Sequence, residues 1–182
     1  MWEITSPNPV KLIVGILAAN EDSLQAGLKS VKTEFGKEDI LSPVWPFTQT
    51  EYYKEQAGDN ILRQFISFDK LIDPGELAKI KHKTNAIEQI LAAKLVSPYP
   101  RPVNLDPGII EPAKLILAST KNFSHRIYIG DNMYAELTLS YSKGQWESYK
   151  YTFPDYKESR YHDYLSEVRQ RLVEQLRKMK AK

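Results

Sequence analysis

The chain has 182 residues, the length of one ordinary domain, and its 42% apolar and 26% charged residues are typical of a globular protein. A formal net charge of +2 excludes a whole-molecule field that attracts nucleic acid or an anionic membrane. The absence of cysteine excludes disulfides, thiolate metal sites and cysteine nucleophiles. The longest apolar run, residues 12–19, is much shorter than the roughly 20 residues that span a bilayer. We therefore expect a cytoplasmic protein without a membrane partner.

The first quarter of the chain predicts a strand, a helix and a second strand. Residues 11–19 are apolar without alternation, which is typical of a strand buried on both faces. Asn20 then caps a helix that ends at Gly36. Prolines restrict residues 40–47 to an edge strand or a loop, because proline cannot donate to a strand ladder.

A third strand and a second helix follow. Residues 61–68 have the composition of a strand. Asp73 predicts a helix start, because Pro74 suits the first helical position and Glu76 completes a capping box. Residues 103–105 form the next strand. The order strand, helix, strand, strand, helix, strand is the ferredoxin-like βαββαβ pattern.

The second half of the chain predicts a short helix, three strands and a long final helix. Pro112 suits the start of a helix over residues 112–119. The three strands form an added hairpin and meander, and the final helix begins near Ser159. We expect one α+β domain over residues 1–182, with a largely antiparallel sheet and helices packed on one face.

The register of these three strands follows from their apolar positions. Odd-numbered residues in these strands are apolar, so the residue numbers of two cross-strand partners must add up to an even number. A slip of one residue would exchange the two faces of the strand. Three-residue loops at residues 130–132 and 142–144 satisfy this rule. Arg126, Glu136 and Lys150 should then form one charged row across three strands.

Six short segments together carry a family resemblance. They are Val10-Lys11-Leu12, Leu71-Ile72-Asp73-Pro74, Val103-Asn104-Leu105-Asp106-Pro107-Gly108, Thr120-Lys121 to His125-Arg126-Ile127-Tyr128, Tyr134-Ala135-Glu136-Leu137-Thr138-Leu139 and Tyr151-Thr152-Phe153-Pro154-Asp155-Tyr156. In this order they resemble the prokaryotic family catalogued as domain of unknown function 4416. The resemblance covers nearly the whole chain and implies no activity or cofactor. Some members are labelled GTP-binding, but this chain has no G-x-x-x-x-G-K-[ST] phosphate loop.

The densest polar cluster lies between Asn104 and Glu136. Asp106 and His125 are the acid–base candidates if the protein is an enzyme, a question that the sequence leaves open. The candidate ligand-binding residues are Asn104, Lys121, Arg126 and Glu136. Two cations, an amide and carboxylates predict binding of a small anionic ligand, such as a nucleotide or a phosphorylated metabolite. No metal site is expected, because no histidine has a second ligand at metal spacing.

Each candidate has a structural alternative. Asp106 begins an Asp-Pro-Gly sequence that is common in ordinary turns. His125 shares the apolar face of its strand, which favours a hydrogen-bonded core histidine, and charged rows usually lie on solvated faces. An alternative function is a non-enzymatic RNA- or protein-binding module with a tyrosine-rich sheet face. The tyrosines concerned are Tyr52, Tyr53, Tyr128, Tyr134, Tyr151, Tyr156, Tyr161 and Tyr164.

Overall fold

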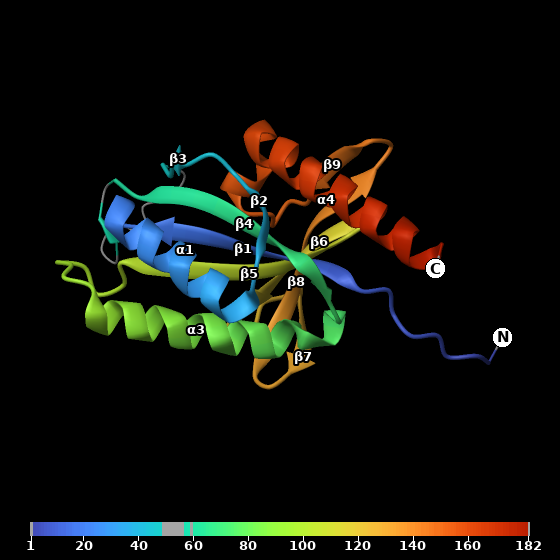
Figure 1. Cartoon of the computed structure of the whole chain (residues 1–182), viewed down its shortest axis with the longest axis horizontal. Helices are drawn as coiled ribbons and strands as arrows, with labels where there is room; N and C mark the ends of the chain where they lie inside the picture. The colour runs from blue at the N-terminus through green and yellow to red at the C-terminus, as the bar shows by residue number, and fades with distance from the viewer. Residues whose placement is uncertain (1, 49–56, 59, 182) are drawn as a thin grey trace.

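The computed structural model describes residues 2–48, 57–58 and 60–181 (Figure 1). The strands in this part of the chain are β1 (Val10–Ala18), β2 (Glu38–Leu41), β3 (Trp45–Pro46), β4 (Leu62–Ile72), β5 (Val103–Glu111), β6 (Lys114–Ser119), β7 (Arg126–Gly130), β8 (Met133–Ser142) and β9 (Gln145–Ser148). They form one antiparallel sheet in the order β2-β4-β1-β5-β6-β8-β7, with β3 beside β4 and β9 beside β8. The fold is therefore α+β with an antiparallel sheet. The proline-containing segment lies at the sheet edge, as the sequence predicts.

The central strand β1 is buried over its whole length. Strands β4 and β5 pair with its two edges, and its side chains alternate between two apolar clusters. Leu12, Val14 and Ile16 belong to one cluster, whereas Ile13 belongs to the other. The continuous apolar run is thus explained by cover on both faces.

Helices cover both faces of the sheet, so the prediction that they pack on one face is wrong (Figure 1). Helices α1 (Glu21–Phe35) and α3 (Leu77–Lys94) contact the face of Leu12. Helix α4 (Ser159–Lys180) packs on the opposite face. Its buried stripe is Tyr161, Tyr164, Leu165, Val168, Leu172 and Leu176. A strand that is apolar on both sides needs such a second layer, because either exposed face would leave apolar surface in water.

The predicted caps at Asn20 and Asp73 form, but among the described residues no hydrogen bond of the Glu76 side chain completes the predicted capping box. The Asn20 side chain accepts a hydrogen bond from the Ser23 amide at 2.8 Å. The Asp73 side chain accepts one from the Gly75 amide at 2.7 Å, at the start of the 3₁₀ turn η2 (Pro74–Glu76) that leads into α3. Each cap supplies a partner to an amide that the first helical turn leaves unpaired.

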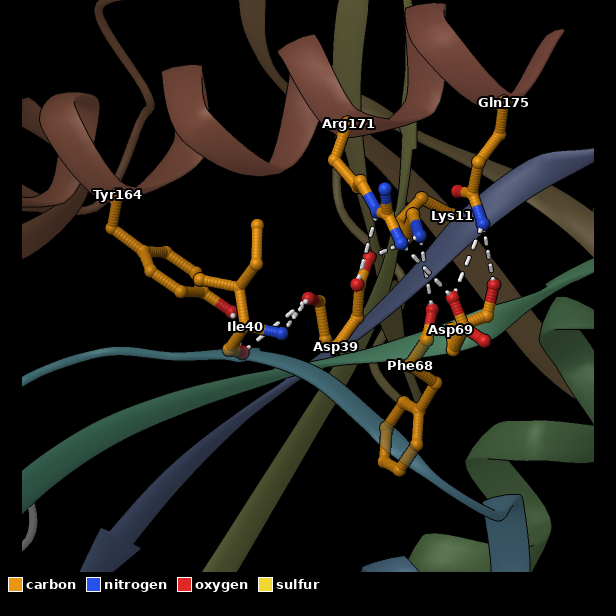
Figure 2. Close-up of polar contacts among 9 residues, drawn as sticks. Lys11, Asp39, Ile40, Phe68, Asp69, Tyr164, Arg171 and Gln175 are labelled. Atoms are coloured by element: carbon orange, nitrogen blue, oxygen red, sulfur yellow. Dashed lines mark hydrogen bonds and ion pairs between the residues drawn. The ribbon is translucent and has the colours of Figure 1, made fainter. Parts of the chain in front are cut away.

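Polar contacts attach α4 to the edge of the sheet, a set that we call the Lys11 network (Figure 2). Lys11 Nζ donates to Asp39 Oδ2 at 2.6 Å and to the Phe68 carbonyl at 3.2 Å. Arg171 Nε of α4 donates to Asp39 Oδ1 at 3.1 Å, and Gln175 donates to the Asp69 carbonyl at 2.8 Å. Burial lowers the pKa of Lys11, and the charge of Asp39 opposes that shift.

The Asp-Pro-Gly sequence lies inside β5, so the turn and the helix predicted after it are both wrong. Strand β5 pairs with β1 from Val103 to Ile110 and continues through Pro107. Strand β6 pairs with β5 only from Gly108 onward, so Pro107 has a neighbouring strand on one side alone. Long-range pairing with β1 therefore outweighs the local turn preference.

Residues 112–119 form a turn and a strand instead of a helix. Glu111 of β5 lies opposite Lys114 of β6, which leaves Pro112 and Ala113 as the connecting turn. Pro112 suits the second position of a turn as well as it suits the start of a helix. The segment then pairs with β5 and β8, and this pairing decides its structure.

The register of the first C-terminal hairpin agrees with its apolar pattern. Arg126 lies opposite Glu136, as predicted. The loop, however, is the two-residue turn Asp131-Asn132, with φ of 50° and 57°. A two-residue turn alone would pair odd-numbered with even-numbered residues. A register shift between Tyr128 and Gly130 corrects this, so that Tyr128 lies opposite Tyr134 and Arg126 opposite Glu136.

The second hairpin does not follow the predicted register. Lys143 and Gly144 form a two-residue turn with φ of 50° and 87°, and Tyr141 lies opposite Trp146. Trp146 is buried in the cluster under α4, so the even positions of β9 face inward. Lys150 lies beyond β9, and the predicted row of three charges is reduced to Arg126 and Glu136.

Candidate functional site

A cavity of about 490 Å³ opens where β5 loses its neighbour β6. Its wall comes from strands β4, β5, β6, β7 and β8, from helix α3, from the connecting segments around Phe47, Arg101 and Lys121, and from the segment that contains the 3₁₀ turn η3 (Pro154–Lys157). The lining residues are Phe47, Arg63, Lys81, Arg101, Asn104, Asp106, Leu117, Ala118, Ser119, Thr120, Lys121, Arg126, Glu136, Phe153, Pro154, Asp155 and Tyr156. The lining contains five cationic and three acidic side chains.

Arg63 of β4 forms a buried ionic centre in this wall. Its side chain is 3% exposed, and Nη2 donates to Asp155 Oδ2 at 2.8 Å. Nη1 lies 3.5 Å from Asp106 Oδ2. Burial lowers the pKa of Arg63, but Asp155, Tyr156 and Asp106 outweigh burial and raise it above its ordinary value. Arg63 therefore keeps its positive charge at neutral pH.

Aromatic rings hold the Arg63 guanidinium in place. Its central carbon lies 5.3 Å from the Phe47 ring centroid, 5.1 Å from that of Phe65 and 5.8 Å from that of Tyr156. Gly15 of β1 leaves the room that this arrangement needs. A Cβ at Gly15 would lie 2.7 Å from Arg63 Nη1 and 2.9 Å from Phe65 Cε1.

Asn104 and Asp106 project from the same side of β5. Asn104 Nδ2 donates to Asp106 Oδ2 at 2.7 Å, the oxygen that also faces Arg63. The Asp106 side chain remains 26% exposed. Of the two carboxylates that face Arg63, Asp106 is therefore the more exposed, since the Asp155 side chain is 5% exposed.

Glu136 of β8 is the most buried carboxylate of the cavity wall. Its side chain is 2% exposed, and Oε2 accepts from Arg126 Nε at 2.9 Å and lies 3.1 Å from His125 Nε2. Arg126 Nη1 also donates to the Lys121 carbonyl at 3.0 Å. These contacts connect β8 to the segment before β7 on one side of the cavity.

The structure brings five of the six predicted site residues together. Asn104, Asp106, Lys121, Arg126 and Glu136 line the cavity. His125 lies outside the lining and touches Glu136. Its ring stacks on Tyr151 with centroids 4.1 Å apart, so it is a half-buried surface histidine and not part of the apolar core.

Sequence reasoning missed the residues that come from distant segments. Arg63 and Gln64 interrupt a strand that otherwise predicts burial, and this pair of polar residues was the available signal for Arg63. Asp155 belongs to a segment that carried the family resemblance but had no predicted role, and Tyr156 was considered only as part of a tyrosine-rich sheet face. Burial raises the pKa of Asp155, although the charge of Arg63 opposes the shift.

Three polar atoms of the cavity wall are buried without a hydrogen-bond partner in the described part of the chain. They are Arg63 Nε, Tyr156 Oη and Glu136 Oε1. Buried polar atoms are hydrogen-bonded in most proteins, because an unpaired one keeps its full desolvation cost. Such atoms also occur elsewhere in the described residues, for example Tyr161 Oη and Gln175 Oε1, so they point to a binding site here only together with the cavity and its charged lining.

The tyrosines of the alternative hypothesis have separate positions. Tyr156, Tyr161 and Tyr164 pack against Phe65 in the core under α4. Tyr128 is 57% exposed on the edge strand β7. Tyr52 and Tyr53 lie outside the described residues. Helices also cover both faces of the sheet at its centre, where a flat binding face was expected.

Two classes of site can be assessed for residues 2–48, 57–58 and 60–181. No cluster of three or more histidine, aspartate or glutamate side chains there has the arrangement to hold a metal ion. None of the helices in that part is long and apolar enough to cross a membrane.

The fold and the site define an α+β protein with an open antiparallel sheet and a charged cavity beside its fifth strand. The sequence profile described as Domain of unknown function (DUF4416) matches residues 8–172, and the chain belongs to this family. The resemblance inferred from the sequence is thus confirmed. Comparison with curated proteins and with solved structures gives no significant match.

Proposed function

We propose that this protein binds a small anionic organic ligand, a nucleotide or a phosphorylated metabolite, in the cavity beside β5. The observation that carries the proposal is the convergence of five cationic side chains on one cavity whose wall contains unpartnered buried polar atoms. Like charges repel in an empty site, so such a gathering favours a bound anion.

The cations are held by other parts of the protein, which supports a prearranged site. Lys81 Nζ donates to the Leu105 carbonyl at 2.9 Å. Arg101 pairs with Glu88 at 2.6 Å, and Glu88 also accepts from the Leu105 amide at 2.7 Å. A site whose charges are already oriented loses less side-chain entropy when a ligand binds.

The cavity volume of about 490 Å³ is within the range of small-molecule sites. Leu117, Phe153 and Tyr156 add apolar surface to the charged wall, which suits an organic ligand better than a bare ion. The proposal includes a cytoplasmic location, and the longest apolar run supports it, since that run forms the buried strand β1. If a reaction accompanies binding, Asp106 is the acid–base candidate with direct access to the cavity, whereas His125 acts only through Glu136.

A thermal-shift experiment with a panel of phosphates tests the proposal. The panel is inorganic phosphate, glycerol 3-phosphate, ribose 5-phosphate and the four nucleoside 5′-monophosphates, each at constant ionic strength. A ligand at a hundred times its Kd stabilises the folded state by about 2.7 kcal/mol. For a chain of this length, that raises the Tm by about 5–10 °C.

The variant Lys121→Ala and its control Lys114→Ala locate the effect. Both remove one lysine charge, but Lys114 pairs with Glu111 outside the cavity. We expect Lys121→Ala to reduce the ligand-induced shift strongly and Lys114→Ala to leave it intact. No shift with any phosphate, or an equal loss in both variants, would contradict the proposal.

A further inference from the structure

Glu136 is an unexpected residue for the wall of an anion site. Its carboxylate carries a negative charge, its side chain is 2% exposed, and it lies among the residues that line the cavity. A carboxylate at this position repels a simple anion such as inorganic phosphate. A cavity selected only for anions would gain affinity if this residue were neutral.

The two oxygens of this carboxylate have different environments. Arg126 Nε and His125 Nε2 both contact Oε2, at 2.9 Å and 3.1 Å. Oε1 is buried and has no hydrogen-bond partner in the described part of the chain. An ionised oxygen of this kind is among the strongest hydrogen-bond acceptors that a protein can offer.

Donors suited to a phosphate line the same cavity as this acceptor. Arg126 uses Nε for Glu136 and Nη1 for the Lys121 carbonyl, and within the described residues its Nη2 makes no hydrogen bond. Tyr156 Oη, also in the cavity wall, is buried without a partner. The wall thus offers cationic donors and a carboxylate acceptor to one ligand.

Resting on the proposed function, we infer that the ligand is an organic phosphate that carries an O–H or N–H donor, and that Glu136 selects it by accepting that donor at Oε1. The phosphate contacts Arg126 and Lys121, and the hydroxyl or amino group of the same molecule faces Glu136. Sites built around a hydrogen-bonding group reject analogues that lack it, because their own buried group then stays unpaired. Glu136 is accordingly the residue that distinguishes the metabolite from inorganic phosphate.

A matched pair of ligands tests this inference on the wild-type protein. Glycerol 3-phosphate and propyl phosphate have the same chain length and differ by two hydroxyl groups. We expect calorimetry to give glycerol 3-phosphate at least tenfold tighter binding. Equal affinities would overturn the inference but leave the proposed function standing. Absence of binding by every phosphate in the larger panel would overturn both.

The variant Glu136→Gln tests the residue itself. The amide oxygen of glutamine can still accept from Arg126, but its NH₂ group then replaces the acceptor Oε1 with a donor. We expect the preference for glycerol 3-phosphate to fall by about tenfold, while propyl phosphate binds as tightly or more tightly because a negative charge has gone. Retention of the wild-type preference would overturn the assignment to Glu136. If the variant does not fold, the wild-type ligand pair still decides the inference.

Discussion

Two buried ionic clusters lie on the same face of the sheet, and they differ in how their carboxylates are paired. In the Lys11 network, Asp39 uses one carboxylate oxygen for Lys11 and the other for Arg171 (Figure 2). In the cavity wall, Glu136 Oε2 contacts Arg126 and His125, whereas Oε1 has no hydrogen-bond partner among the residues that the structure describes. The first cluster joins α4 to the sheet. Its buried atom without a partner is the neutral amide oxygen Gln175 Oε1. The second cluster leaves an oxygen of a carboxylate without a hydrogen-bond partner in the described part of the chain, and we attribute that oxygen to ligand binding.

The comparison also explains why buried charge alone does not identify a site. Lys11 is fully buried and the Arg63 side chain is 3% exposed, so burial does not separate them. The difference is that Arg63 lines a cavity and Lys11 does not line that cavity. Unsatisfied polar atoms next to an accessible space are therefore the more informative signal.

The largest expected effect is in the Lys11 network. Asp39→Asn should lower the free energy of unfolding by about 3 kcal/mol, because it leaves the buried Lys11 ammonium without its charged partner. Urea denaturation measures this change, with Lys83→Ala as a control that breaks the exposed pair with Glu34 and costs less than about 1 kcal/mol. The ligand-induced Tm shift should survive in Asp39→Asn. Loss of that shift would show that the two clusters are not independent.

Gly15→Ala should destabilise the protein less than Asp39→Asn does, but it should weaken ligand binding more. The new Cβ would meet Arg63 Nη1 and Phe65 Cε1 at less than normal contact distance, and overpacking of this kind costs about 1–3 kcal/mol. Because the Arg63 guanidinium must move, binding of the phosphate panel should weaken. A variant that is destabilised but binds as the wild type does would show that the position of Arg63 does not matter to the ligand.

The smallest expected effect is a pH dependence of stability. Burial raises the pKa of Asp155, so the folded protein keeps this proton to a higher pH than the unfolded chain, whose aspartates titrate near pH 3.9. The contribution of Asp155 to stability is therefore full below about pH 3.9 and is lost as pH rises through the folded pKa. Urea melts should show that the free energy of unfolding of the wild type minus that of Asp155→Asn decreases as the pH rises from about 4. A difference that grows with pH would mean that the attraction of Arg63 outweighs burial.

Local signals were sufficient for much of the fold. The apolar run of β1, the caps Asn20 and Asp73 and the edge position of β2 follow from residues close together in the chain. The prediction failed where distant pairing decided the outcome. Pro107 lies in a strand because β1 pairs with it, and Trp146 sets the register of β9 because it packs under α4. Neither partner is visible in the local sequence.

Some residues of the candidate site could likewise be predicted from the local sequence, whereas others depend on contacts between distant segments. Asn104, Asp106, Lys121, Arg126 and Glu136 come from one stretch of the chain, and their polar character predicted a shared location. Arg63 and Asp155 are 92 residues apart and meet only through the order of the strands and the turn η3. The role of Glu136 Oε1 could not be predicted either, because an unpaired atom is a property of the packed structure.

Amide chemical-shift mapping tests the central claim most directly. Ribose 5-phosphate would be titrated into the ¹⁵N-labelled full chain while its ¹H–¹⁵N spectrum is followed. The account predicts that the perturbed amides cluster at residues 104–106, 117–126 and 153–156, with the amides of Lys11, Asp39 and Arg171 unchanged. Saturable perturbations centred on the Lys11 network or on the exposed strand β7, with none around the cavity, would contradict it.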